Sequence, residues 1–153
     1  MTDRLEFEIF QEPLPQKRHR HTKSGHVYDP SYKDKQNFCK EAMIYEPHQP
    51  IPGGIAIELI FFMLRPKIHF GTGKNINKLK ESSPYEHITT PDTDNLVKFV
   101  LDSLGADGRF FNDDRQIISV KAKKLYANSR DTARTYVCLY SLDKEDILRW
   151  SLN

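Results

Sequence analysis

The sequence is poor in cysteine, tryptophan and long apolar runs. Its 153 residues include two cysteines and one tryptophan, and Cys39 and Cys138 lack any CxxC or Cys/His metal spacing. This pattern predicts two reduced structural thiols, not a disulfide framework or a zinc site. The longest apolar run, residues 55–64, contains Glu58 and is too short for a transmembrane helix.

Composition and length predict an ordinary globular chain that forms one domain over residues 1–153. Hydrophobic residues make up 38% of the chain and charged residues 29%, as in soluble globular proteins of this size. The opening residues, Met-Thr-Asp-Arg, lack the charged-then-apolar pattern of a signal peptide. We therefore expect a cytoplasmic protein with no membrane association.

Hydrophobic periodicity predicts an α+β fold with a small mixed β-sheet and two main helices. The predicted elements are a strand at 5–9, a polar loop at 16–30, a helix capped by Ser31 and ending before Pro47, a buried strand at 55–64, a helix at 94–104, strands at 117–126 and 135–140, and a short helix at 142–150. The strands at 117–126 and 135–140 flank a turn at 128–131, so we expect them to pair as a hairpin.

The net charge of +2 is small, but the charges are unevenly distributed. Bases concentrate at 17–23, 65–80 and 121–124, whereas acids collect at 92–114. Basic segments around an acidic focus are typical of a polyanion that lies over a metal site, although three solvated surface runs are an equal alternative on charge alone. The candidate DNA contacts are Lys17, Arg18, Arg20 and Lys23, and, in a long basic loop at 65–90, Arg65, Lys67 and Lys74.

The most informative segment is residues 91–95, Pro-Asp-Thr-Asp-Asn, at the mouth of the predicted helix 94–104. At ~100° per residue, a helical wheel places Asp94, Lys98 and Asp102 within one polar arc while apolar residues fill the rest. This strip is expected to face a cleft. Thr93 is predicted to cap the helix, with Asp92 just outside its first turn.

A second acidic pair, Asp113 and Asp114, is expected at the start of the strand 117–126, with one carboxylate pointing back to Asp92 and Asp94. Carboxylates and water are the ligands that suit Mg²⁺, and such a site serves phosphodiester hydrolysis. For any single aspartate, a helix cap or a polar turn is the simpler interpretation. Lys98 either contacts the scissile phosphate or forms an i,i+4 ion pair with a neighbouring acid.

The spaced pattern DxDNxxKxxxDxL over residues 92–104, followed by DDxQ at 113–116, resembles the RusA family of Holliday-junction resolvases. The resemblance implies a homodimeric endonuclease that nicks four-way DNA junctions symmetrically during recombination and repair, using Mg²⁺ or, as a substitute, Mn²⁺. By motif position, the metal carboxylates are Asp92, Asp94 and Asp114, the essential base is Lys98, and the supporting acids are Asp102 and Asp113. The segment at 65–90 is longer than compact members need and resembles a phage and prophage branch of the family. As the family acts on DNA, the resemblance also implies association with the nucleoid.

Two other classes of protein remain as alternatives. A non-catalytic, structure-selective DNA-binding dimer would keep the basic segments, although the key acids are all present. Sugar-nucleotide transferases and phosphatases with a DxD site usually place that motif directly after an apolar strand. Residues 87–91, His-Ile-Thr-Thr-Pro, form a poor end to such a strand.

Overall fold

A computed structural model describes residues 4–153 and shows a four-stranded mixed sheet in the order β1-β6-β4-β5. The sheet comprises β1 (Arg4–Ile9), β4 (Ile55–Met63), β5 (Ile117–Tyr126) and β6 (Arg134–Ser141), and the helices are α1 (Tyr32–Ala42), α2 (Thr93–Gly105) and α3 (Lys144–Ser151). A separate two-stranded ribbon pairs β2 (Arg20–His21) with β3 (Val27–Tyr28). The α+β class with a small mixed sheet is therefore confirmed.

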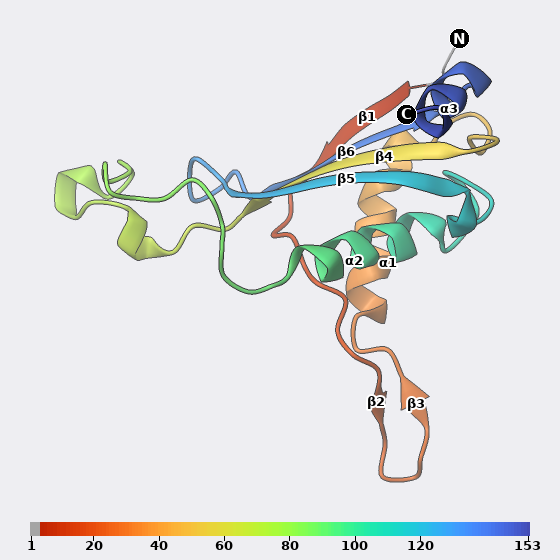
Figure 1. Cartoon of the computed structure of the whole chain (residues 1–153). Coiled ribbons are helices and arrows are strands. Elements are labelled where there is room, and N and C mark those ends of the chain that lie inside the picture. The colour runs from red at the N-terminus through yellow and green to blue at the C-terminus, as the bar shows by residue number, and fades with distance from the viewer. Residues whose placement is uncertain (1–3) are drawn as a thin grey trace.

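Helices α1 and α2 cover one face of the sheet, and the core lies between them and the strands (Figure 1). Alternate residues of β4, such as Ile57 and Phe61, are buried against this helix layer because side chains alternate between the two faces of a strand. Phe38 of α1 meets Phe99 of α2 edge to face, with ring centroids 5.7 Å apart. This contact packs α2 against α1 within the helix layer.

The predicted hairpin between the last two strands is wrong. Strand β4 lies between them, parallel to β5 and antiparallel to β6. After β5 the chain crosses the end of β4, where Ala127 N donates to the carbonyl of Met63 at 2.9 Å. The central position pairs both edges of the most apolar strand, whereas the lysine-rich β5 suits a sheet edge.

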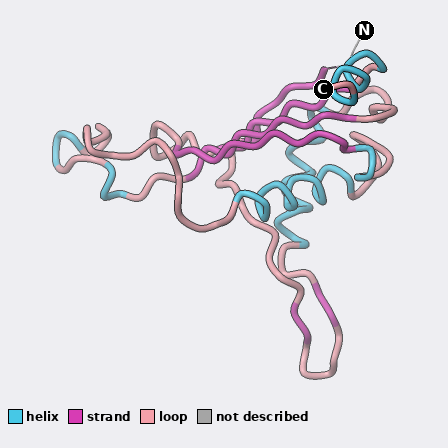
Figure 2. Tube along the Cα trace, viewed as in Figure 1, coloured by secondary structure: helices cyan, strands magenta, loops and turns pink. Residues whose placement is uncertain are grey.

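Two segments extend beyond the body formed by the sheet and its helices (Figure 2). Residues 17–29, here called the basic ribbon, were expected to be a loop but contain the paired strands β2 and β3, with Gly25 at φ 83° in the turn. Residues 65–90, here called the excursion, form a long connection with short 3-10 turns at Lys67–His69 and Gly73–Asn75. No helix within residues 4–153 has the length and apolar character needed to cross a bilayer.

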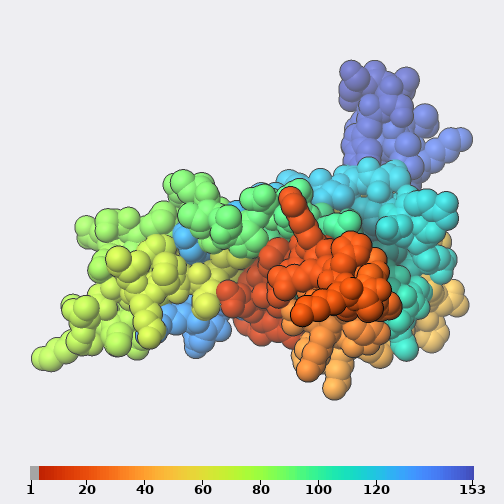
Figure 3. Space-filling model, turned by 90° about the horizontal axis from the view of Figure 1, so that it is seen from below, coloured from red at the N-terminus to blue at the C-terminus, as the bar shows by residue number. Residues whose placement is uncertain are grey.

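The C-terminal helix α3 lies on the opposite side of the sheet from the basic ribbon (Figures 1 and 3). Asp143 caps it by accepting a hydrogen bond from Asp146 N at 2.8 Å. Both cysteines are free and buried, and burial raises the pKa of each thiol. Helix α2, which follows Asp92 and contains Asp94, lies on the side of the sheet that also bears the ribbon (Figure 1).

Candidate active site

The first acidic pair lies at the N-terminus of α2. Asp92 occupies the N-cap position, but its side chain makes no capping hydrogen bond, and Thr93 is the first helical residue instead of the predicted cap. Asp94 is exposed in the first turn, where the helix dipole favours a negative charge. Neither carboxylate is paired with a cation in residues 4–153. Both are therefore available to a ligand.

The second acidic pair belongs to a 3-10 turn, Asp114–Gln116, that leads directly into β5. Asp113 caps this turn: its carboxylate accepts from Arg115 N at 2.8 Å and pairs with the Arg115 guanidinium at 2.7 Å. The hydrogen bond from the Arg115 side chain holds the pKa of Asp113 well below its usual range. Asp113 is thus used within the turn, whereas Asp114 is exposed and has no ion-pair partner in the described chain.

A groove of about 560 Å³ between α2 and β5 brings most of the predicted residues together. This α2–β5 groove is lined by Thr93, Asp94, Val97, Lys98, Leu101, Asp102, Asp114 and Val120. Val97, Leu101 and Val120 form its apolar part, and its charged residues come from both sides of the groove. Asp92 is not part of the lining, although it directly precedes α2.

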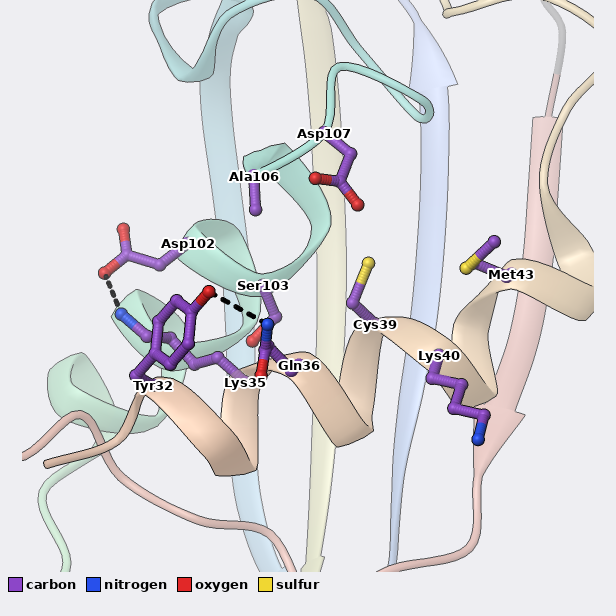
Figure 4. Close-up of a pocket in the computed structure, with 10 residues that line it drawn as sticks. All are labelled: Tyr32, Lys35, Gln36, Cys39, Lys40, Met43, Asp102, Ser103, Ala106 and Asp107. Atoms are coloured by element: carbon purple, nitrogen blue, oxygen red, sulfur yellow. Dashed lines mark hydrogen bonds and ion pairs between the residues drawn. The ribbon is translucent and has the colours of Figure 1, made fainter. Parts of the chain in front are cut away.

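Lys98 and Asp102 differ in how they are held within this groove. In the described part of the chain no carboxylate forms an ion pair with Lys98, so the i,i+4 pairing considered for it does not occur. Asp102 lies 3.6 Å from Lys35 Nζ of α1 (Figure 4) and also lines a second cleft between α1 and α2. Lys98 is free to bind substrate, and Asp102 is partly committed to the helix layer.

The groove supplies the donor chemistry that Mg²⁺ prefers, but not a preassembled cage. Within residues 4–153, no group of three His, Cys, Asp or Glu side chains stands close enough together to hold a metal ion. Mg²⁺ is usually held by one or two carboxylates with waters and substrate phosphates completing its octahedron. Asp94 and Asp114, both unpaired in the same groove, fit that mode of binding. The metal ligands assigned by motif stay a prediction.

In the sequence, Lys124 is distinguished only as a member of the basic segment at 121–124. Its ammonium donates to the carbonyls of Thr89 and Pro91, each at 2.6 Å, and so holds the backbone that leads into Asp92. Alternation along β5 puts Lys124 on the same sheet face as Ala122, which packs against the core. A lysine on the buried face of a strand was the available signal for a specific role.

The predicted DNA contacts occupy different environments. Those at positions 17, 18, 20 and 23 are exposed on the basic ribbon, which points toward the viewer in Figure 3, and Lys67 and Lys74 are exposed on the excursion. Arg65 is only 3% exposed, so its assignment as a DNA contact is wrong. Its guanidinium donates to the carbonyls of Ala127 at 2.5 Å and Pro84 at 2.7 Å. Arg65 instead ties the excursion to the end of β5.

Two histidines pack against Tyr126 at the base of the excursion, with ring centroids 4.9 Å (His69) and 4.6 Å (His87) from the tyrosine ring. Burial lowers the pKa of both, helped by the nearby Arg65 and Lys80 at His69 and by Lys124 at His87.

Acidification is therefore expected to loosen the excursion. A histidine whose pKa is lower in the folded than in the unfolded protein binds its proton more readily when unfolded. The stability that it contributes is complete above the ordinary value of 6.5 and is lost as the pH falls from there towards the folded pKa. Amide hydrogen exchange of residues 65–90, measured between about pH 8 and pH 5 and corrected for intrinsic rates, tests this. His87→Phe should weaken the pH dependence and His48→Phe, at an exposed position, should not; protection that is equal at both ends of the range would contradict it.

Comparison with known proteins agrees with this arrangement. The family model described as endodeoxyribonuclease RusA matches residues 11–140, which include the α2 motif, the 3-10 turn and the basic ribbon. A search of curated proteins gives no match. The match covers most of the chain, and helix α3 lies outside it. The family resemblance expected from residues 92–104 and 113–116 is thus confirmed, and the chain belongs to the RusA endodeoxyribonuclease family.

Proposed function

We propose that the protein is a Mg²⁺-dependent endodeoxyribonuclease that resolves Holliday junctions by paired symmetric nicks during DNA recombination and repair. Family membership supports DNA endonuclease activity. The observation that carries the finer assignment is one open groove in which Asp94, Asp114 and Lys98 meet, beside a projecting ribbon of exposed bases. Unpaired acids next to unpaired bases suit a phosphodiester held over a cation.

The residues of the groove divide the work of hydrolysis. Asp94 and Asp114, with Asp92 at the N-cap, would hold Mg²⁺, which when bound supplies charge neutralisation at the phosphate and a more acidic water. Lys98, one helical turn after Asp94, donates to a nonbridging oxygen of the scissile phosphate and fixes its orientation. Arg115 keeps Asp113 in its capping role, so that Asp113 supports the turn that presents Asp114.

Paired nicks require two active sites. A four-way junction has two-fold symmetry, and a homodimer offers two equivalent α2–β5 grooves to it. The basic ribbon and Lys67 and Lys74 of the excursion then hold the arms through phosphate contacts, each of which adds to the salt dependence of binding. Such a protein acts on DNA at the nucleoid.

End-labelled four-way junctions test this function. With Mg²⁺ or Mn²⁺, the protein should cut fixed and mobile junctions at symmetric positions in opposing strands, while duplexes with the same arm sequences remain intact. EDTA should abolish cutting, and the protein should sediment as a dimer. A junction that is shifted in a gel but left uncut with either metal would support the alternative, a non-catalytic DNA-binding dimer.

A further inference from the structure

The basic ribbon projects from the body, and none of the four residues of its strands is buried. Isolated two-stranded ribbons are marginal in water, so the direction in which this one points depends on how its ends are fixed. The residues entering and leaving the ribbon are joined directly. Lys17 N donates to Ser31 Oγ at 2.9 Å, and Gln16 Nε2 donates to Asp29 Oδ1 at 2.9 Å.

Asp29 is the centre of this base. Its Oδ1 also accepts from Ser31 N at 2.9 Å, and its Oδ2 pairs with Lys35 Nζ of α1 at 2.5 Å. The side chains of Asp29 and Lys35 are 15% and 17% exposed. Burial alone raises the pKa of Asp29, but the hydrogen bonds from Lys35, Ser31 and Gln16 outweigh it and hold the pKa below its usual value. The pair is therefore charged and largely shielded from solvent.

The same base is attached to the catalytic helix at two points. Gln16 N donates to the carbonyl of Asn95 at 2.9 Å, one residue after Asp94. Lys35 Nζ also lies 3.6 Å from Asp102, which lines the α2–β5 groove, and Figure 4 shows Lys35 reaching from α1 to that carboxylate. Lys35 thus lies between Asp29, at the base of the ribbon, and Asp102, which lines the groove.

We propose that Asp29 and Lys35 are positioning residues for junction cleavage, which lock the direction of the basic ribbon to α2 so that a strand gripped by the ribbon enters the α2–β5 groove in register. The proposal rests on the proposed function for the identity of the DNA, but the lock itself is a property of the free protein. A rigid link matters here because a small misplacement of the reacting phosphate greatly slows a reaction that depends on positioning.

Kinetic and binding measurements distinguish a loss of positioning from a loss of phosphate contacts. Asp29→Asn and Lys35→Met should each lower the single-turnover cleavage rate at saturating junction roughly 10- to 100-fold. The ribbon bases remain in both variants, so the salt dependence of junction binding should keep its slope. Arg18→Ala with Arg20→Ala removes phosphate contacts of the ribbon itself, so in this double variant junction affinity and its salt slope should both fall.

Because the two residues act through one contact, the double variant Asp29→Asn/Lys35→Met should be no slower than the slower single variant. Asp34→Asn and Lys33→Met, on the same helix and without an ion pair in the described chain, serve as matched controls. Thermal unfolding of every variant shows whether it is folded at the assay temperature. Should Asp29→Asn unfold, Lys35→Met, which keeps the aliphatic stem, carries the test.

Amide hydrogen exchange provides a readout that needs no DNA. In either single variant, the amides of Gln16 and Lys17 should exchange faster than in the wild type, while the core amides of β4 and β6 remain protected. Wild-type cleavage together with wild-type exchange in both variants would overturn the proposal, as would strictly additive losses in the double variant. If the wild type fails to cut any junction while the amides of Gln16 and Lys17 still exchange faster in the variants, the proposed function is wrong but the structural role of Asp29 and Lys35 is supported.

Discussion

Replacing Asp94 or Asp114 by asparagine is expected to lower the rate of junction cleavage by at least about 10³-fold and to leave junction binding intact. Both carboxylates line the α2–β5 groove, and neither is paired with a cation within residues 4–153. Asparagine keeps the shape of the side chain but loses the charge that holds Mg²⁺ against a phosphate. Because the change also removes a repulsion from the DNA backbone, affinity for the junction should stay equal or rise.

Asp92→Asn is expected to follow the same pattern, since the Asp92 carboxylate makes no capping hydrogen bond and is available to a ligand. Cleavage is measured under single-turnover conditions and binding by gel shift in EDTA. Asp107→Asn is the matched control, because Asp107 lies near the end of the same helix but outside the groove. Wild-type cleavage by any one of the three variants Asp92→Asn, Asp94→Asn and Asp114→Asn would remove that residue from the site.

Lys124→Met is expected to slow cleavage by roughly 10- to 100-fold without weakening junction binding. The Lys124 ammonium donates at 2.6 Å to the carbonyls of both Thr89 and Pro91, immediately before Asp92. A hydrogen bond from a charged donor contributes about 1.5–3 kcal/mol. Methionine retains most of the packing of the stem but releases both carbonyls. The backbone that leads into Asp92 is then no longer held in place.

The distinguishing measurement is the Mg²⁺ concentration that gives half-maximal cleavage. If Lys124 positions Asp92, this concentration rises in Lys124→Met and added Mg²⁺ restores part of the rate. A loss of general stability would instead lower the unfolding temperature and leave the Mg²⁺ dependence unchanged. Lys123→Met serves as the control, since Lys123 is exposed and alternation directs it to the other face of β5.

Local elements were predictable from the sequence because their signals are local. The boundaries of β5 follow directly from the apolar pattern of residues 117–126, and the polar arc of α2 predicted the groove that Asp94 and Lys98 now line. The pairing of strands was not predictable in this way. A short apparent turn at 128–131 favoured a hairpin. The pairing of β4 along both of its edges depends instead on the whole sheet, which a local pattern does not reveal.

The site shows the same division between local and long-range information. The sequence does not reveal whether a charged side chain in a loop is buried, so Arg65 was predicted to contact DNA. In the structure its guanidinium instead donates to carbonyls 19 and 62 residues away in the chain. Lys124 was hidden among neighbouring lysines because its partners, Thr89 and Pro91, are more than 30 residues distant. Long-range hydrogen bonds, rather than residue type, separate these two residues from the bases that remain at the surface.

The burial of both thiols makes the protein suitable for site-specific labelling. Cys39 and Cys138 are the sole cysteines of the sequence, both are buried, and their raised pKa values disfavour the reactive thiolate. A cysteine introduced at exposed Ser24, near the tip of the basic ribbon, is therefore expected to react alone with a maleimide dye. Fluorescence from that one position can then follow the ribbon as a junction arrives and as its strands are released.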